Sequence, residues 1–142
     1  MKIGILGGSF DPIHNGHVHM ALAACKEFAL DQVWLIPAGH SPNKEEKAMT
    51  DAEHRYRMCE IAAHADARLK VSRVEIDSDE RSFTYRTLQK LNEEYSEDRF
   101  YFIMGGDSLD YFDRWVYPEI ITKLCIILVM RLKPYNSMAL MD

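Results

Sequence analysis

The chain has 142 residues, of which 47% are apolar and 27% charged, and its formal net charge is −5. This length and apolar content suffice for the core of one domain and exclude a disordered chain. The acidic balance argues against a general nucleic-acid-binding protein, whereas a local phosphate site at a helix end is compatible with it.

Three cysteines without a C-x-x-C pair are typical of reduced thiols in the cytosol. The longest apolar run, Leu124–Met130, is far shorter than the roughly 20 residues of a membrane span. We therefore expect a cytoplasmic protein with neither a membrane nor a nucleic-acid partner.

Predicted strands and helices alternate in the first half of the chain. Lys2–Leu6 and Gln32–Ile36 are short apolar runs typical of buried strands, and glycine or proline follows each. Between them, apolar residues recur at helical spacing from Val18 to Ala29, which predicts a first helix. The sequence Thr50-Asp51-Ala52-Glu53 has the pattern of a capping box and predicts the start of a second helix.

The second half continues this alternation. Three more strands are expected, at Leu69–Ile76 with an irregularity, Arg99–Met104 and Cys125–Met130. Helices are expected at Thr84–Tyr95, Asp107–Phe112 and Pro118–Leu124. Ser82 is a candidate cap for the first of these helices, whose inner face would carry Leu88 and Leu91.

This alternation predicts an α/β fold: a Rossmann-like, doubly wound parallel sheet of about five strands in a single domain. Ligands of such sheets bind beyond the carboxyl ends of the strands, where we expect the loops 7–17, 37–44 and 105–107. The predicted domain spans residues 1–131. Residues 132–142 show little pattern and are left unassigned.

The loop after the first predicted strand carries the most specific pattern, Gly7-Gly8-Ser9-Phe10-Asp11-Pro12-Ile13-His14-Asn15-Gly16-His17. Its glycines let a phosphate approach the backbone amides, and the helix start that follows offers free N–H groups and a partial positive charge. His14 and His17 are three residues apart, which sets both imidazoles toward one side of the helix. Two imidazoles beside an anion-binding turn suit a phosphoryl group whose charge shifts during transfer. No metal site is predicted, because His19 would project away from His17.

This string resembles the H-x-G-H signature of the nucleotidyltransferase superfamily, and it is most similar to the bacterial nicotinate mononucleotide adenylyltransferase family. Three further elements follow in that family's order. Pro42-Asn43-Lys44 resembles its P-H-K loop, Ser82-Phe83-Thr84 its S-Y-T element, and Gly105-Gly106-Asp107-Ser108 with Trp115 its G-x-D-S…W element. The resemblance covers Met1 to about Arg131. Asn43 replaces the family's usual histidine and cannot carry a positive charge.

The resemblance implies an enzyme that transfers the adenylyl group of ATP to nicotinate mononucleotide, giving nicotinate adenine dinucleotide and pyrophosphate in NAD biosynthesis. It implies that His14 and His17 are catalytic and stabilise charge at the transferring phosphorus. It assigns Thr84 to the nicotinate carboxylate and Trp115 to stacking on the pyridine ring. The residues that it implies for binding ATP, phosphates or ribose are Gly8, Ser9, Phe10, Lys44, Gly105 and Asp107. Mg²⁺ is expected to arrive with ATP, held mainly by phosphates and water.

Three other interpretations stay open. The related pantetheine-phosphate adenylyltransferase usually has threonine in place of His14, and nicotinamide mononucleotide is another acceptor for the same chemistry. The third is a non-catalytic or weakly active nucleotide-binding fragment, because the sequence after Met130 has no match to the family's I-S-S-x-x-[IV]-R element. That interpretation leaves apolar sheet surface uncovered, and it predicts reduced stability or self-association as a homo-oligomer.

Overall fold

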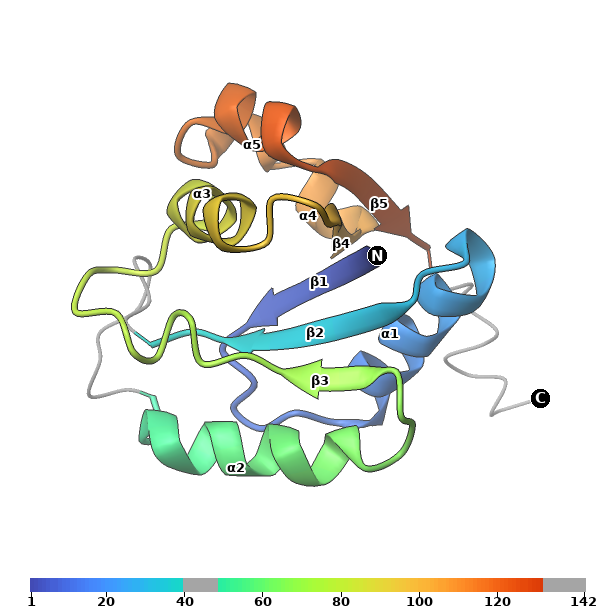
Figure 1. Cartoon of the computed structure of the whole chain (residues 1–142). Helices are drawn as coiled ribbons and strands as arrows, with labels where there is room; N and C mark the ends of the chain where they lie inside the picture. The colour runs from blue at the N-terminus through green and yellow to red at the C-terminus, as the bar shows by residue number, and fades with distance from the viewer. Residues whose placement is uncertain (40–48, 132–142) are drawn as a thin grey trace.

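Five parallel strands form one sheet in the order β3-β2-β1-β4-β5 in the computed structural model, which describes residues 1–39 and 49–131 (Figure 1). The strands are β1 Lys2–Gly8, β2 Gln32–Pro37, β3 Leu69–Val71, β4 Arg99–Gly105 and β5 Ile126–Met130. The helices are α1 Asn15–Phe28, α2 Ala52–Ala63, α3 Thr84–Glu94, α4 Gly106–Leu109 and α5 Pro118–Leu124, with a 3₁₀ helix, η2, at Phe112–Arg114. The predicted α/β class, the five-stranded parallel sheet and the single domain are confirmed.

β1 lies at the centre of the sheet and pairs with β2 on one side and β4 on the other. Ile5 on one face and Leu6 on the other are both buried, as expected for a strand covered on both faces. Helices α1 and α2 cover one face, and α3 and α5 cover the other (Figure 1). The chain order therefore reverses between β1 and β4, and such a reversal is where ligands of open α/β sheets bind.

The predicted capping box at the start of the second helix is wrong, although the helix is present. Asp51 is the N-cap of α2 and makes no side-chain cap hydrogen bond. Glu53 instead forms an ion pair with Arg73, with 2.6 Å between the carboxylate and guanidinium atoms. The Thr50 N–H donates to the Asp11 carboxylate at 2.9 Å. The guanidinium thus competes successfully for the carboxylate that a capping box would use.

The third predicted strand and the predicted Ser82 cap also need correction. β3 ends at Val71, because the following residues turn and the Asp77 N–H donates to the carbonyl of Arg73 at 2.8 Å. Phe83 is the N-cap residue of α3 and gives no side-chain cap. The hydroxyl oxygen of Ser82 instead accepts a hydrogen bond from the N–H of Gly39 at 3.2 Å.

The remaining helices agree more closely with the sequence pattern. Leu88 and Leu91 are each 1% exposed and form the predicted inner face of α3. The helix expected at Asp107–Phe112 is instead two shorter pieces, α4 and η2. No helix within the described residues is long and apolar enough to cross a membrane.

Candidate active site

The turn after β1 is anchored by an aromatic side chain. Phe10 has a φ of 49°, a left-handed value that is uncommon for a large side chain. Its ring is 2% exposed and packs into the core between the sheet and α1, which holds the backbone in this conformation. The ring also meets His17 edge to face, with 5.0 Å between the centroids. The backbone of this turn is therefore positioned by buried packing.

Two histidines cap the start of α1 reciprocally. The Nδ1 of His14 accepts from the N–H of Gly16 at 3.1 Å, and the Nδ1 of His17 accepts from the N–H of His14 at 3.0 Å. The ring centroids lie 3.8 Å apart, so the rings are neighbours, as their spacing predicts. Because both Nδ1 atoms accept hydrogen bonds, we assign the proton of each neutral ring to Nε2. The pair therefore offers two N–H donors beside the free amides of a helix start.

The histidine pair gives a prediction for NMR. Desolvation lowers the pKa of His17 below its ordinary value of 6.5, and the neighbouring charge of His14 lowers it further. We expect His17 to be a neutral Nε2–H tautomer at pH 7 and to titrate with a midpoint below 6.5. Long-range proton–nitrogen correlation spectra over a pH series measure both properties. An Nδ1–H tautomer, or a midpoint above 6.5, would contradict the assigned geometry.

A cavity of about 420 Å³ lies on the α3 and α5 side of the sheet. Its apolar lining includes Ile5, Ile36, Leu88, Phe102 and Ile121. Its lining also brings together four of the predicted site residues, Gly8, Ser9, Thr84 and Trp115. The indole of Trp115 meets the ring of Phe102 edge to face, with 5.6 Å between the centroids, so the packing fixes its orientation. A mostly apolar pocket with a few polar groups in its lining is typical of a small-molecule site.

The other predicted site residues lie outside the lining of this cavity. Phe10 and His17 are on the α1 side of the sheet. A Cβ on Gly105 would lie 3.8 Å from Met20 of α1, which places Gly105 beside the same helix, and Asp107 is exposed in the first turn of α4. Lys44, with its Pro42-Asn43-Lys44 loop, lies outside the described residues. The Gly8–Ser9 turn is therefore the boundary between the histidine side and the cavity side.

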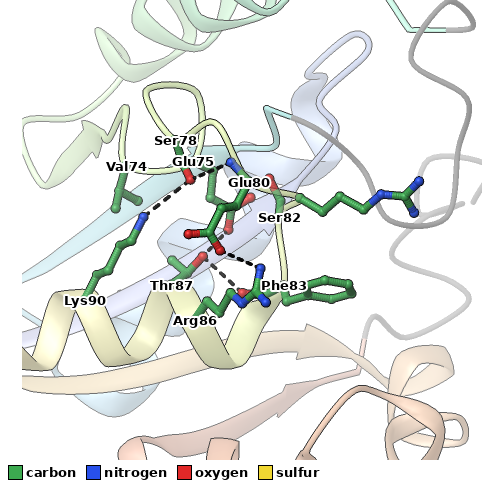
Figure 2. A pocket seen from close by; sticks show the side chains of 10 residues that line it. Val74, Glu75, Ser78, Glu80, Ser82, Phe83, Arg86, Thr87 and Lys90 are labelled. Carbon is green, nitrogen blue, oxygen red and sulfur yellow. Dashed lines mark hydrogen bonds and ion pairs between the residues drawn. The ribbon is translucent and has the colours of Figure 1, made fainter.

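Sequence reasoning missed a carboxylate in the cavity wall. Glu75 lines the cavity. It also lines a small neighbouring pocket, shown in Figure 2, where it accepts a hydrogen bond from the hydroxyl of Thr87 at 2.8 Å. Burial raises the pKa of Glu75 above its ordinary 4.5, against opposing effects of hydrogen bonds from Thr87 and Ser82 and the charge of Lys90. The apolar alternation predicts that Glu75 belongs to the strand Leu69–Ile76 and gives it no role in a site. The turn that follows β3 directs it inward, and no periodicity predicts that turn.

The Glu75 carboxyl gives a prediction for stability. The folded chain binds this proton more tightly than the unfolded chain, so the free energy of unfolding falls as pH rises from 4.5 through the raised pKa. We expect Glu75→Gln to remove that decline. Urea unfolding of both proteins between pH 4 and 8 measures the difference in stability between them. If the unfolding free energy of the wild type, relative to that of Glu75→Gln, rose with pH in this range, the effect would have the opposite sign. That result would contradict the inward, desolvated position of Glu75.

Sequence reasoning also missed Arg55, which is 1% exposed and contacts the turn after β1. Its one signal in the sequence is the spacing of four residues from Cys59, which is buried on the same side of α2. Among residues 1–39 and 49–131, no group of three or more histidine, cysteine or acidic side chains is placed to hold a metal ion.

These features define the class of protein. A parallel sheet whose order reverses beside β1, a glycine turn with capping histidines, and a cavity beyond the strand ends together form a nucleotide-binding protein of Rossmann-like fold. Residues 5–138 match the cytidylyltransferase-like family. The chain belongs to this family, among the nicotinate-nucleotide adenylyltransferases of bacteria.

Two curated relatives support this placement. A protein of Clostridium novyi strain NT named "Probable nicotinate-nucleotide adenylyltransferase" is 39% identical over 135 residues, which cover 95% of this chain and 68% of that protein. A protein of the same name from Clostridium botulinum strain Loch Maree is 43% identical over 121 residues, which cover 85% of this chain and 60% of that protein. The chain thus spans about 60–68% of the length of these relatives.

A solved structure shares the fold. The Plasmodium falciparum nicotinic acid mononucleotide adenylyltransferase complexed with NaAD superposes with a TM-score of 0.75 at 20% identity. The match covers 92% of this chain and 75% of that chain. At this identity the likeness establishes the arrangement of strands and helices, while site chemistry has to be argued from the residues themselves.

Proposed function

We propose that this chain transfers the adenylyl group of ATP to nicotinate mononucleotide, giving nicotinate adenine dinucleotide and pyrophosphate in NAD biosynthesis. One observation carries the proposal: the Gly8–Ser9 turn borders the histidine pair on one side and the cavity on the other. A triphosphate bound at the helix start and a mononucleotide bound in the cavity would meet at this turn. The names of the curated relatives support this choice of substrates.

In the proposed reaction, a phosphate oxygen of the mononucleotide attacks the α-phosphorus of ATP in line. The bond from the α-phosphorus to the bridging oxygen breaks, and pyrophosphate leaves with that electron pair. No covalent intermediate with the protein is required, so the protein contributes positioning and electrostatic stabilisation. Mg²⁺ enters with ATP as part of the substrate and is held mainly by phosphates and water.

The ATP end of the site uses the helix start. The backbone amides of Gly8 and Phe10 and the hydroxyl of Ser9 bind phosphate, and the Nε2–H groups of His14 and His17 donate to the oxygens that gain charge. Because His17 is neutral before ATP binds, its pKa is expected to rise when the phosphates arrive. The ring then becomes a stronger donor at the stage when charge develops.

The acceptor end uses the cavity. Trp115 stacks on the pyridine ring, and Thr84 with nearby amides at the start of α3 receives the nicotinate carboxylate. Lys44 contributes a positive charge to the mononucleotide phosphate. Gly105 and Asp107 belong to the ATP end, beside α1, where they hold ribose hydroxyls. The proposed partners are thus ATP and nicotinate mononucleotide, and the proposed compartment is the cytoplasm.

A comparison of acceptors tests the proposal. The full chain is incubated with Mg-ATP and, in separate reactions, nicotinate mononucleotide, nicotinamide mononucleotide or pantetheine 4′-phosphate, and products are identified by mass spectrometry. We expect the dinucleotide product to form most rapidly with the nicotinate acceptor. A faster reaction with pantetheine 4′-phosphate would reassign the substrate. Mononucleotide binding without product from any acceptor would favour a non-catalytic nucleotide-binding domain.

A further inference from the structure

A buried arginine links three backbone segments at the carboxyl end of the sheet. Arg55 on α2 is 1% exposed. Its Nε donates to the carbonyl of Thr50 at 2.8 Å, and its Nη1 donates to the carbonyls of Ser9 at 2.9 Å and Ala38 at 2.6 Å. These carbonyls come from the turn after β1, the end of β2 and the approach to α2. The guanidinium is therefore a cross-link among segments that are far apart in the sequence.

The charge of Arg55 is unusual for a purely structural cross-link. No carboxylate within the described residues is recorded as its ion-pair partner, and its contacts there are neutral carbonyls. Burying a guanidinium is costly even when its N–H groups donate to carbonyls, and an apolar side chain of similar volume is often as stable. A full positive charge directly behind the turn at Ser9 is favourable when an anion binds on the other side of that turn.

The hydrogen bonds of Arg55 also act through the peptide groups. The carbonyl of Ser9 shares a peptide with the N–H of Phe10, and the carbonyl of Ala38 shares one with the N–H of Gly39. A charge-assisted hydrogen bond at a carbonyl polarises the peptide and makes its N–H a stronger donor. The N–H of Phe10 belongs to the proposed phosphate turn. The N–H of Gly39 donates to the hydroxyl oxygen of Ser82, two residues before Thr84.

We propose that Arg55 is a positioning residue for the transfer reaction. It acts on both ends of the site through the backbone carbonyls of Ser9 and Ala38. It fixes and polarises the Ser9–Phe10 peptide at the ATP end and the Ala38–Gly39 peptide that holds Ser82 at the acceptor end. Arg55 makes no contact with substrate in this role. The inference rests on the proposed function, because it assigns the triphosphate to the turn after β1.

Two variants of the full chain test this inference, with a matched control. Arg55→Met removes the charge at similar volume, and Arg55→Lys keeps the charge without the fork of donors. The control is Arg57→Met, two residues along α2, where the side chain is 74% exposed and pairs with Glu60. The measurements are thermal unfolding, the amide NMR shifts of Phe10 and Gly39, binding of inorganic tripolyphosphate, and steady-state pyrophosphate release.

We expect Arg55→Met to move the Phe10 and Gly39 amide protons upfield and to weaken tripolyphosphate binding. The value of kcat/KM for Mg-ATP should fall at least tenfold, with a raised KM for Mg-ATP. Arg55→Lys should recover part of this loss, and Arg57→Met should match the wild type. If Arg55→Met fails to fold, Arg55→Lys is compared with Arg57→Met by the same measurements.

A purely structural role would give a different result. Lower thermal stability with unchanged amide shifts, tripolyphosphate affinity and KM for Mg-ATP would overturn the inference. A wild-type chain that binds tripolyphosphate but releases no pyrophosphate would count against the proposed function alone. In that case, equal tripolyphosphate affinity and equal amide shifts in wild type and Arg55→Met would still reject the role of Arg55.

Discussion

His17→Ala is expected to reduce the rate of pyrophosphate release by about 10²–10³-fold, the usual effect of removing one donor to a developing negative charge. The Nε2–H of His17 is the donor that this variant removes. The variant also removes the ring that accepts the His14 N–H at 3.0 Å, so the cap of α1 is weakened. Loss of a cap costs about 0.5–2 kcal/mol of stability, which should leave the chain folded. Steady-state rates and urea unfolding measure the two effects separately.

Two control variants separate catalysis from capping. Glutamine is a usual residue at the third helical position of a capping box, so His17→Gln should recover most of the stability and little of the rate. His19→Ala changes an exposed side chain two residues further along α1 and should leave both quantities unchanged. A rate in His17→Ala within threefold of the wild type would exclude His17 as a catalytic residue.

Gly39→Ala is the second variant with a large expected effect, because a Cβ at Gly39 would collide with the backbone of Glu75. It would meet the carbonyl oxygen of Glu75 and lie 3.0 Å from its carbon and 3.1 Å from the Cα of Ile76. Backbone atoms cannot yield as a flexible side chain can. We expect a loss of about 1–3 kcal/mol in unfolding free energy and a higher KM for the mononucleotide. The KM rises because the Gly39 hydrogen bond to Ser82 is displaced.

Gly106→Ala is the matched control for this variant. The nearest recorded atom to a Cβ at Gly106 is the Cγ of Arg131 at 4.0 Å, an ordinary contact. Urea unfolding and acceptor titrations on both variants make the comparison. Equal stability of Gly39→Ala and Gly106→Ala would show that the loop after β2 and the segment after β3 do not pack as described.

The strands and helices could be predicted from the sequence, because burial imposes a regular spacing of apolar residues on them. β1, β2 and β4 begin where their apolar runs begin, and Leu88 and Leu91 occupy the predicted face of α3. The contacts of the loops were harder to predict. A polar side chain there can choose among several hydrogen-bond or ion-pair partners, and no regular spacing in the sequence indicates which one it takes. Glu53 could serve a capping box or an ion pair, and only the position of Arg73 after β3 decides between them.

In the candidate site, too, residues set by local spacing could be predicted and residues set by loop contacts could not. The spacing of His14 and His17 predicts neighbouring rings, because both lie within one helix start. Glu75 and Arg55 could not be found in this way. Glu75 enters the cavity wall through an aperiodic turn, and the partners of Arg55 are carbonyls, which carry no residue-specific signal. Their positions depend on three segments meeting at the end of the sheet.

The most direct test of the central claim follows the α-phosphorus itself. The full chain is incubated with nicotinate mononucleotide and Mg-ATP labelled at the α-phosphorus, with His17→Ala in parallel. We predict that the label appears in nicotinate adenine dinucleotide with one equivalent of unlabelled pyrophosphate, and that this product is about 10²–10³-fold slower to form with His17→Ala. Unchanged labelled ATP after incubation with folded wild-type chain that binds both substrates would contradict the claim that this site performs adenylyl transfer.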